Sequence, residues 1–159
     1  MKQPNEKSPQ VQLNAFMAKY VPEVVATAKA TLAKMRTHVP GAIEFVYDNY
    51  NGLVVGFGPN ERPSDAVMSI VLFPRWVTLC FLQGGPDIPD PQRLLRGSGK
   101  HVRHMRLAAA TDLDKPAVRA LIAEALAMAD PPIDPSGRRR MIIRSVSAKQ
   151  RPRRPRTNA

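Results

Sequence analysis

The sequence has little cysteine, few aromatic residues and no long apolar run. Cys80 is the only cysteine in 159 residues, which excludes an intrachain disulfide. Its apolar neighbours predict a buried thiol, which suits a reducing compartment. No apolar run is long enough to cross a bilayer, and the polar first residues contain no secretory leader. We therefore expect a cytoplasmic protein without a membrane partner.

Acidic residues are missing from the last part of the chain. All 13 precede residue 137, whereas nine of the 24 lysines and arginines lie in residues 138–156. The net charge of +11 therefore belongs mainly to this end, and the body is nearly neutral. We predict a loose N-terminus over residues 1–10, one folded domain over residues 11–130, and a disordered basic tail over residues 131–159.

Hydrophobic periodicity changes along the body from helical to alternating and back. Apolar residues recur at helical spacing in residues 11–19, and again from Pro22 to just before Pro40. A last helix follows Asp114, which we expect to cap it. The pattern predicts an α+β fold, in which an antiparallel sheet of about five strands packs against N-terminal helices and a C-terminal helix. The expected strands cover residues 43–48, 53–58, 66–73, 76–82 and 102–107.

A glycine turn next to a charged strand is the main candidate for ligand binding. Glycines allow backbone amides to approach an anion, and the neighbouring cations supply charge. Alternate strand residues share a face, so Lys100, His104 and Arg106 are expected to line one face beside the turn. The alternative is an ordinary turn and a charged edge strand that resists aggregation. The candidate anion site comprises Gly97, Ser98, Gly99, Lys100, His104 and Arg106.

The same turn does not complete a nucleotide-hydrolase loop. Leu94 stands where a P-loop needs glycine, and His101 stands where it needs serine or threonine for magnesium. No nucleophile elbow or Ser/His/Asp set is apparent either, so we expect a binding protein rather than an enzyme. We assign the large aromatic side chains to the core rather than to an apolar cavity. These are Phe57, Phe73, Trp76 and Phe81.

The arginines of the predicted tail have two interpretations. They are suited to nonspecific, salt-sensitive binding of nucleic acid, because each guanidinium grips phosphate oxygens in pairs. Without aromatic residues the tail has nothing on which bases could stack. The alternative is a solubilising terminus without a partner. The candidate residues are Arg138, Arg139, Arg140, Arg144, Arg151, Arg153, Arg154 and Arg156.

Several short motifs together resemble a known family. They are Val-Pro-Gly-Ala at residues 39–42 leading into Glu44, Gly-Phe-Gly at residues 56–58, and Leu-Leu-Arg-Gly-Ser-Gly-Lys at residues 94–100. Over residues 17–128 the chain resembles the YdhG-like domain family, whose members are mostly of unknown function. The resemblance implies a two-layer sandwich related in shape to frataxin.

Iron binding is a further implication of this resemblance, because some relatives have been linked to intracellular iron handling. Iron carriers of this kind rely on clustered carboxylates, since oxygen ligands hold the metal. The available candidates are Glu44, Asp48 and Asp112, which do not form a dense acidic ridge. The alternative interpretation is that such acids are helix caps and solvated strand positions.

Overall fold

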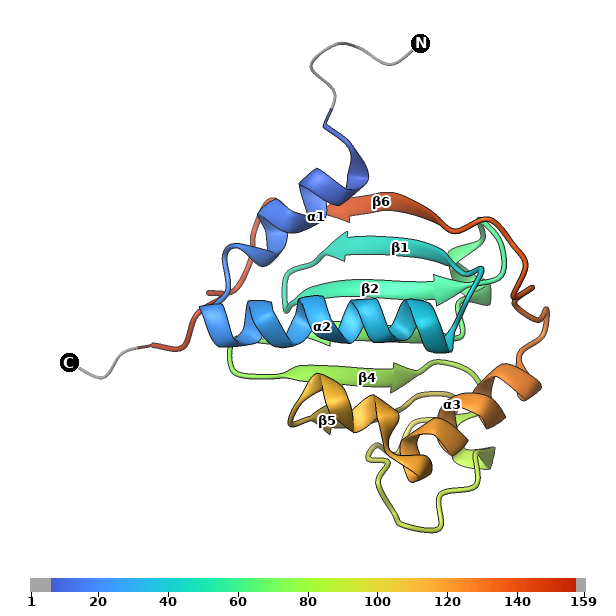
Figure 1. Ribbon diagram of the computed structural model, residues 1–159. Helices are drawn as coiled ribbons and strands as arrows, with labels where there is room; N and C mark the ends of the chain where they lie inside the picture. The colour runs from blue at the N-terminus through green and yellow to red at the C-terminus, as the bar shows by residue number, and fades with distance from the viewer. Residues whose placement is uncertain (1–6, 157–159) are drawn as a thin grey trace.

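The computed structural model describes residues 7–156, which form a two-layer α+β fold (Figure 1). Three helices and six strands build it, and three short 3-10 turns at residues 63–65, 85–87 and 110–114 join them. No helix in the described residues is long and apolar enough to cross a membrane. The helices are α1 (Pro9–Met17), α2 (Pro22–His38) and α3 (Pro116–Met128); the strands are β1 (Ile43–Asp48), β2 (Leu53–Gly58), β3 (Met68–Leu72), β4 (Val77–Phe81), β5 (Arg103–Leu107) and β6 (Arg140–Val146).

Local signals set the ends of the helices. The Ser8 hydroxyl accepts a hydrogen bond from the Val11 amide at 3.2 Å and caps α1. Pro22 and Pro116 stand in the first turns of α2 and α3, where the missing N–H costs nothing. Asp114 does not cap α3 as we predicted. Its carboxylate instead pairs with Lys34 of α2 at 2.6 Å.

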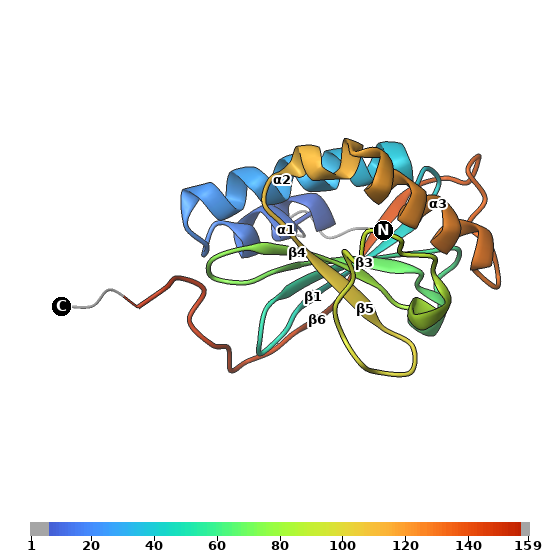
Figure 2. The same cartoon turned by 90° about the horizontal axis from the view of Figure 1, so that it is seen from below.

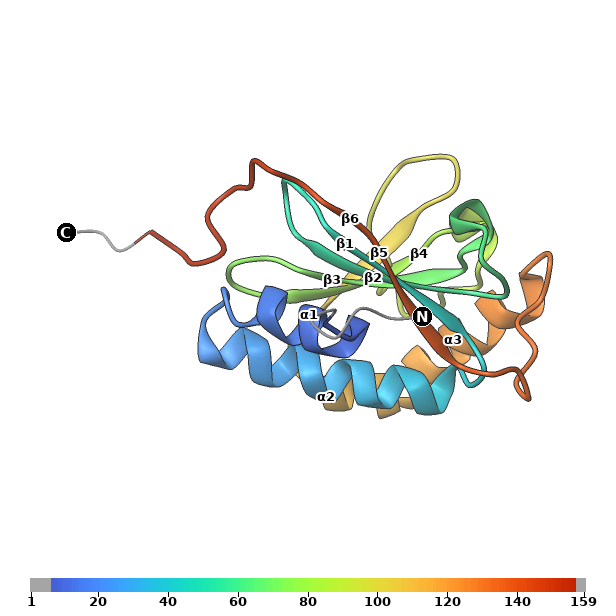
Figure 3. The same cartoon turned by 90° about the horizontal axis from the view of Figure 1, so that it is seen from above.

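The strands lie in the order β5-β4-β3-β2-β1-β6. Five of them were predicted within two residues, including β5 as an edge strand, and those five pair antiparallel throughout. Figures 2 and 3 show all three helices on one side of the sheet. The α+β prediction is therefore confirmed.

The two faces of the sheet differ in what covers them. Val55, Ile70 and Leu79 are register partners on the helix-covered face and are fully buried. The other face, here called the open face, carries Thr78 and Cys80 of β4 opposite Arg106 and His104 of β5. Because side chains alternate along a strand, these four positions lie on the side that no helix covers.

The prediction of a disordered tail over residues 131–159 is wrong for its central part. Residues 140–146 form β6, which pairs in parallel with β1 and makes the sheet mixed and six-stranded. Met141 and Ile143 pack against the core, and this burial together with the backbone ladder fixes the strand. The folded domain thus extends past residue 130. At the other end, α1 begins within the predicted loose N-terminus; residues 1–6 and 157–159 lie outside the described part.

Candidate functional site

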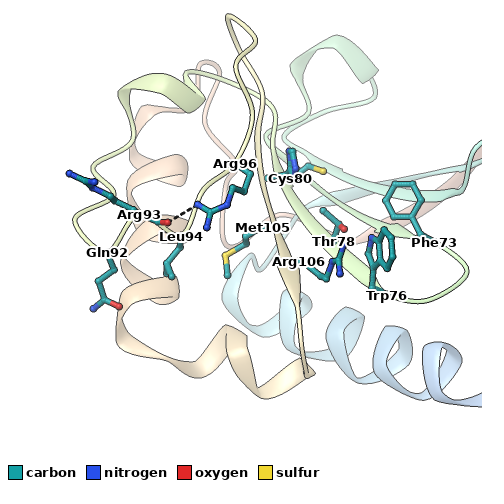
Figure 4. Close-up of a pocket in the computed structure, with 11 residues that line it drawn as sticks. Phe73, Trp76, Thr78, Cys80, Gln92, Arg93, Leu94, Arg96, Met105 and Arg106 are labelled. Atoms are coloured by element: carbon teal, nitrogen blue, oxygen red, sulfur yellow. Dashed lines mark hydrogen bonds between the residues drawn. The ribbon is translucent and has the colours of Figure 1, made fainter.

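A cleft of about 820 Å³ lies on the open face along β4 and β5 (Figure 4). Thr78 and Cys80 form its floor together with His104 and Arg106 of the neighbouring strand. The β3–β4 loop forms one side, and the chain before β5 forms the other. The cleft is therefore built where an uncovered sheet face meets two loops.

The β3–β4 loop places two aromatic rings in the cleft. The Phe73 amide donates to the Trp76 carbonyl at 2.9 Å, which closes the turn. The two rings lie 5.9 Å apart at an angle of 46°. The Arg106 guanidinium lies over the Trp76 ring, 3.6 Å from its centroid. This cation–π contact holds Arg106 in place, because it restricts a long side chain without neutralising its charge.

Hydrogen bonds restrain the loop that forms the opposite side of the cleft. The Asp90 carboxylate accepts hydrogen bonds from the Leu94 and Leu95 amides, each at 2.9 Å. Arg96 then pairs with His104 through two backbone hydrogen bonds and extends the sheet edge by one residue. The Arg96 guanidinium donates to the Arg93 carbonyl at 2.9 Å, the contact drawn as a dashed line in Figure 4.

The charge in the cleft is positive and uncompensated. Arg93, Arg96 and Arg106 line it with His104, and none of the residues that line it is acidic. Within residues 7–156, these three arginines form no salt bridge. Unpaired guanidinium groups beside aromatic rings suit an anion that carries a planar group. Burial raises the pKa of the Cys80 thiol in the cleft floor, although a hydrogen bond with Ser69 opposes the shift.

The structure divides the predicted anion site into two parts. His104 and Arg106 lie in the cleft as their strand parity predicted. Gly97, Ser98, Gly99 and Lys100 form an exposed loop and do not line it. The Arg103 guanidinium donates to the Gly99 and Val102 carbonyls and so stabilises the loop. Of the two glycines in this loop, only Gly97 has a conformational reason to be glycine. Its φ is 118°, and an added Cβ would lie 3.3 Å from the Val102 carbonyl oxygen.

The candidate iron ligands on β1 are already engaged by cations. Glu44 is 1% exposed and accepts from Arg36 at 2.9 Å and from Arg139 at 2.6 Å. Asp48 is fully buried and pairs with Lys19 at 2.6 Å and Arg153 at 2.9 Å. Both carboxylates therefore act as structural anchors in ion pairs that join β1 to α2, to the turn before α2 and to the C-terminal chain.

Asp112 also has a structural role. Its carboxylate accepts from the Ala108 and Ala109 amides and pairs with Lys115 at 2.9 Å. Burial acts to raise the pKa of Asp112, but the hydrogen bonds from Lys115 and the two amides outweigh it and lower that pKa. Among the described residues, no three His, Cys, Asp or Glu side chains come together as a metal site. The geometry thus offers no support for iron at Glu44, Asp48 and Asp112.

The arginines of the C-terminal chain fall into three groups. Arg139, Arg140 and Arg153 form ion pairs with Glu44, Glu61 and Asp48. Arg138 and Arg144 are exposed. The others line a second hollow of about 860 Å³, which shares Phe73 and Trp76 with the cleft; its cations are Arg75, Arg151, Arg154 and Arg156.

Sequence reasoning missed the residues that complete the cleft. Phe73 and Trp76 were assigned to the core, yet both are only partly buried and lie in the loop between β3 and β4. Arg93 and Arg96 carry no motif of their own. The one available signal was Thr78, a polar residue in an otherwise apolar strand, which indicates an uncovered face.

Comparison with known proteins adds no assignment, since no family model, curated protein or solved structure matches the chain. The resemblance to the YdhG-like family stays a prediction.

Proposed function

We propose that the chain is a binding protein whose ligand carries phosphate, and that the cleft along β4 and β5 is the binding site. The observation that carries the proposal is the set of three unpaired arginines in a cleft whose lining contains no carboxylate. Phosphate oxygens accept paired hydrogen bonds from guanidinium groups, and neighbouring aromatic rings favour a ligand with a planar group.

The proposal moves the anion site from the glycine turn to the cleft. Arg106 and His104 keep the role predicted for them, while Lys100 of the exposed loop does not. Arg96 replaces it as a donor because its loop is tied down by Asp90 and by the backbone pairing of Arg96, whereas the Arg93 guanidinium extends away from Arg96 and Arg106 (Figure 4). Such restraint lowers the entropy cost of ordering side chains on binding.

The test is calorimetric titration of the full chain with ATP and with tripolyphosphate, which lacks the planar group. We expect both to bind, with ATP tighter. Arg106→Ala should weaken both at least fivefold, whereas Lys100→Ala, which removes the same charge outside the cleft, should change neither affinity. The reverse pattern would place the site at the glycine turn, and no binding of either probe would refute the proposal.

A further inference from the structure

The cleft and the second hollow form one continuous surface around the β3–β4 loop. Phe73 and Trp76 line both, so the loop stands between two positively charged depressions. Figures 2 and 3 show the loop before β5 and the chain after β6 extending on the side of the sheet away from the helices. We call this combined area the arginine surface, defined by the two rings and by Arg75, Arg93, Arg96, Arg106, Arg151, Arg154 and Arg156.

Among the described residues, no acidic side chain pairs with the arginines of the arginine surface. In the part of the chain that the structure describes, none of these arginines forms a salt bridge, whereas Arg139, Arg140 and Arg153 do. Neither depression has an acidic residue in its lining. The paired arginines thus build the fold, and the unpaired ones remain for a ligand with several negative charges.

The C-terminal side of this surface is held in place. The Arg151 amide donates to the Tyr50 carbonyl at 2.9 Å, and Arg154 donates from Nε to the Lys19 carbonyl at 3.1 Å. Between them, Arg153 is 6% exposed and bonded to Asp48. A chain anchored at three successive points forms a fixed wall rather than a loose arm, which reduces the ordering cost of binding.

From this arrangement we infer that the arginine surface binds single-stranded nucleic acid, with backbone phosphates in the two depressions and bases at Phe73 and Trp76. This inference rests on the proposed function and extends its ligand from one phosphate-bearing group to a chain of them. Aromatic rings set among cations match a strand with unstacked bases, because every base offers a flat face to stack on. A duplex hides those faces, and an anionic membrane or acidic peptide offers none.

The first experiment separates the two depressions. Anisotropy is measured for a labelled oligothymidylate of about 16 nucleotides, a length at the upper end of common single-strand sites, with ATP as competitor. We expect the oligonucleotide to bind at least fivefold tighter than ATP. Arg75→Ala and Arg154→Ala should each weaken it at least threefold and leave ATP binding unchanged, while Arg106→Ala should weaken both. Arg144→Ala is the matched control, since that exposed arginine lies outside both depressions.

The second experiment tests the rings. A duplex of the same length should bind at least fivefold more weakly than the single strand, and Phe73→Leu should remove most of this difference. Equal binding of both forms, or an unchanged preference in Phe73→Leu, would overturn the inference. So would phosphatidylserine vesicles that bind the chain while the oligonucleotide does not.

The two proposals fail in different ways. If ATP binds in the cleft and the oligonucleotide binds no tighter, the single-strand inference is wrong and the proposed function stands. If neither ATP, tripolyphosphate nor oligonucleotide binds, both are wrong.

Discussion

Arg153 has a structural role in the fold rather than the binding role that the sequence indicated. It was a candidate for gripping nucleic acid, yet its guanidinium is buried against Asp48 and lies 5.8 Å from the centre of the Tyr20 ring. Tyr20 donates to the Leu72 carbonyl and accepts from the Leu53 amide, which ties the turn between α1 and α2 to the sheet. Burial raises the pKa of the Tyr20 phenol, and the charge of Arg153 opposes this shift. The cluster makes the C-terminal chain part of the core.

Arg153→Met should destabilise the protein. It leaves the buried Asp48 carboxylate with Lys19 as its remaining charged partner, and breaking a buried pair in this way costs about 3 kcal/mol. Urea unfolding measures the loss, with Arg144→Ala as the matched control for charge. Equal unfolding free energies in the two variants would contradict the buried role of Arg153.

Cys80 is a native reporter of the cleft. Because burial raises the pKa of its thiol, we expect it to react more slowly with a disulfide reagent at pH 8 than a free cysteine does, and to speed up as pH rises further. Bound ATP should slow the reaction further at any given pH, because it would cover the cleft floor. A rate that matches free cysteine and ignores ATP would show that the thiol lies outside the binding site.

Single residues could be predicted where a local rule acts. His104 and Arg106 were placed on one face because strand parity is fixed by the backbone. Arg93 and Arg96 could not be, since their positions depend on Asp90 and on contacts with a strand that follows in the chain. The roles of Glu44 and Asp48 as anchors likewise depend on partners far away in sequence, Arg139 and Arg153.

At the scale of elements, β6 is the main departure from the sequence prediction. Its three apolar residues, Met-Ile-Ile at residues 141–143, stand among arginines, and such a composition is typical of disorder. What fixes the strand is pairing with the exposed edge of β1 and burial against α1 and the core. Neither is visible in a local pattern. The other five strands were predictable because their alternation and the Asn-Gly turn at residues 51–52 are local signals.

Ending the chain at Gly137 should unfold or strongly destabilise the domain. This truncation exposes the β1 edge and removes the Arg139 and Arg153 partners of two buried carboxylates. We expect a lower melting temperature or aggregation in thermal scans, with a chain ending at Arg156 as the control. If the shortened protein melts like the full chain, β6 is not part of the stable sheet.

The turn at residues 110–114 should make the fold sensitive to acid. Burial acts to raise the pKa of Asp112, but hydrogen bonds from Lys115 and the Ala108 and Ala109 amides outweigh it; a hydrogen bond from Lys34 lowers the pKa of Asp114. A lowered folded pKa means that the stabilisation is fully present above the unfolded value of about 3.9 and is lost as pH falls through the folded value.

Urea midpoints measured between pH 6 and pH 2.5 should therefore fall on the acid side. Asp112→Asn should unfold more easily at pH 6 and show a shallower acid decline than the parent chain. A parent midpoint that stays level over this range would contradict the role assigned to these carboxylates.

At the scale of the whole molecule, the charged residues of the two sides of the sheet have different roles. The helix-covered side uses ion pairs to attach α2, β1 and the C-terminal chain to one another, as with Arg36 and Glu44. The open face keeps its arginines unpaired around Phe73 and Trp76. Net charge and fold class were readable from the sequence, but this division was not, because it depends on which arginines the fold brings to a carboxylate.

The salt dependence of oligothymidylate binding to the full chain is the sharpest test of phosphate binding by the unpaired arginines. Seven arginines line the two depressions, and single strands lose roughly 0.7 in the logarithmic salt slope per phosphate neutralised, which predicts a slope near −5 if all engage. Arg106→Ala should reduce the magnitude of the slope by about 0.7, the contribution of one phosphate contact, and Arg144→Ala should not change it. A shallow slope, or equal slopes in the parent chain and Arg106→Ala, would contradict the claim that the unpaired arginines of the open face bind phosphate.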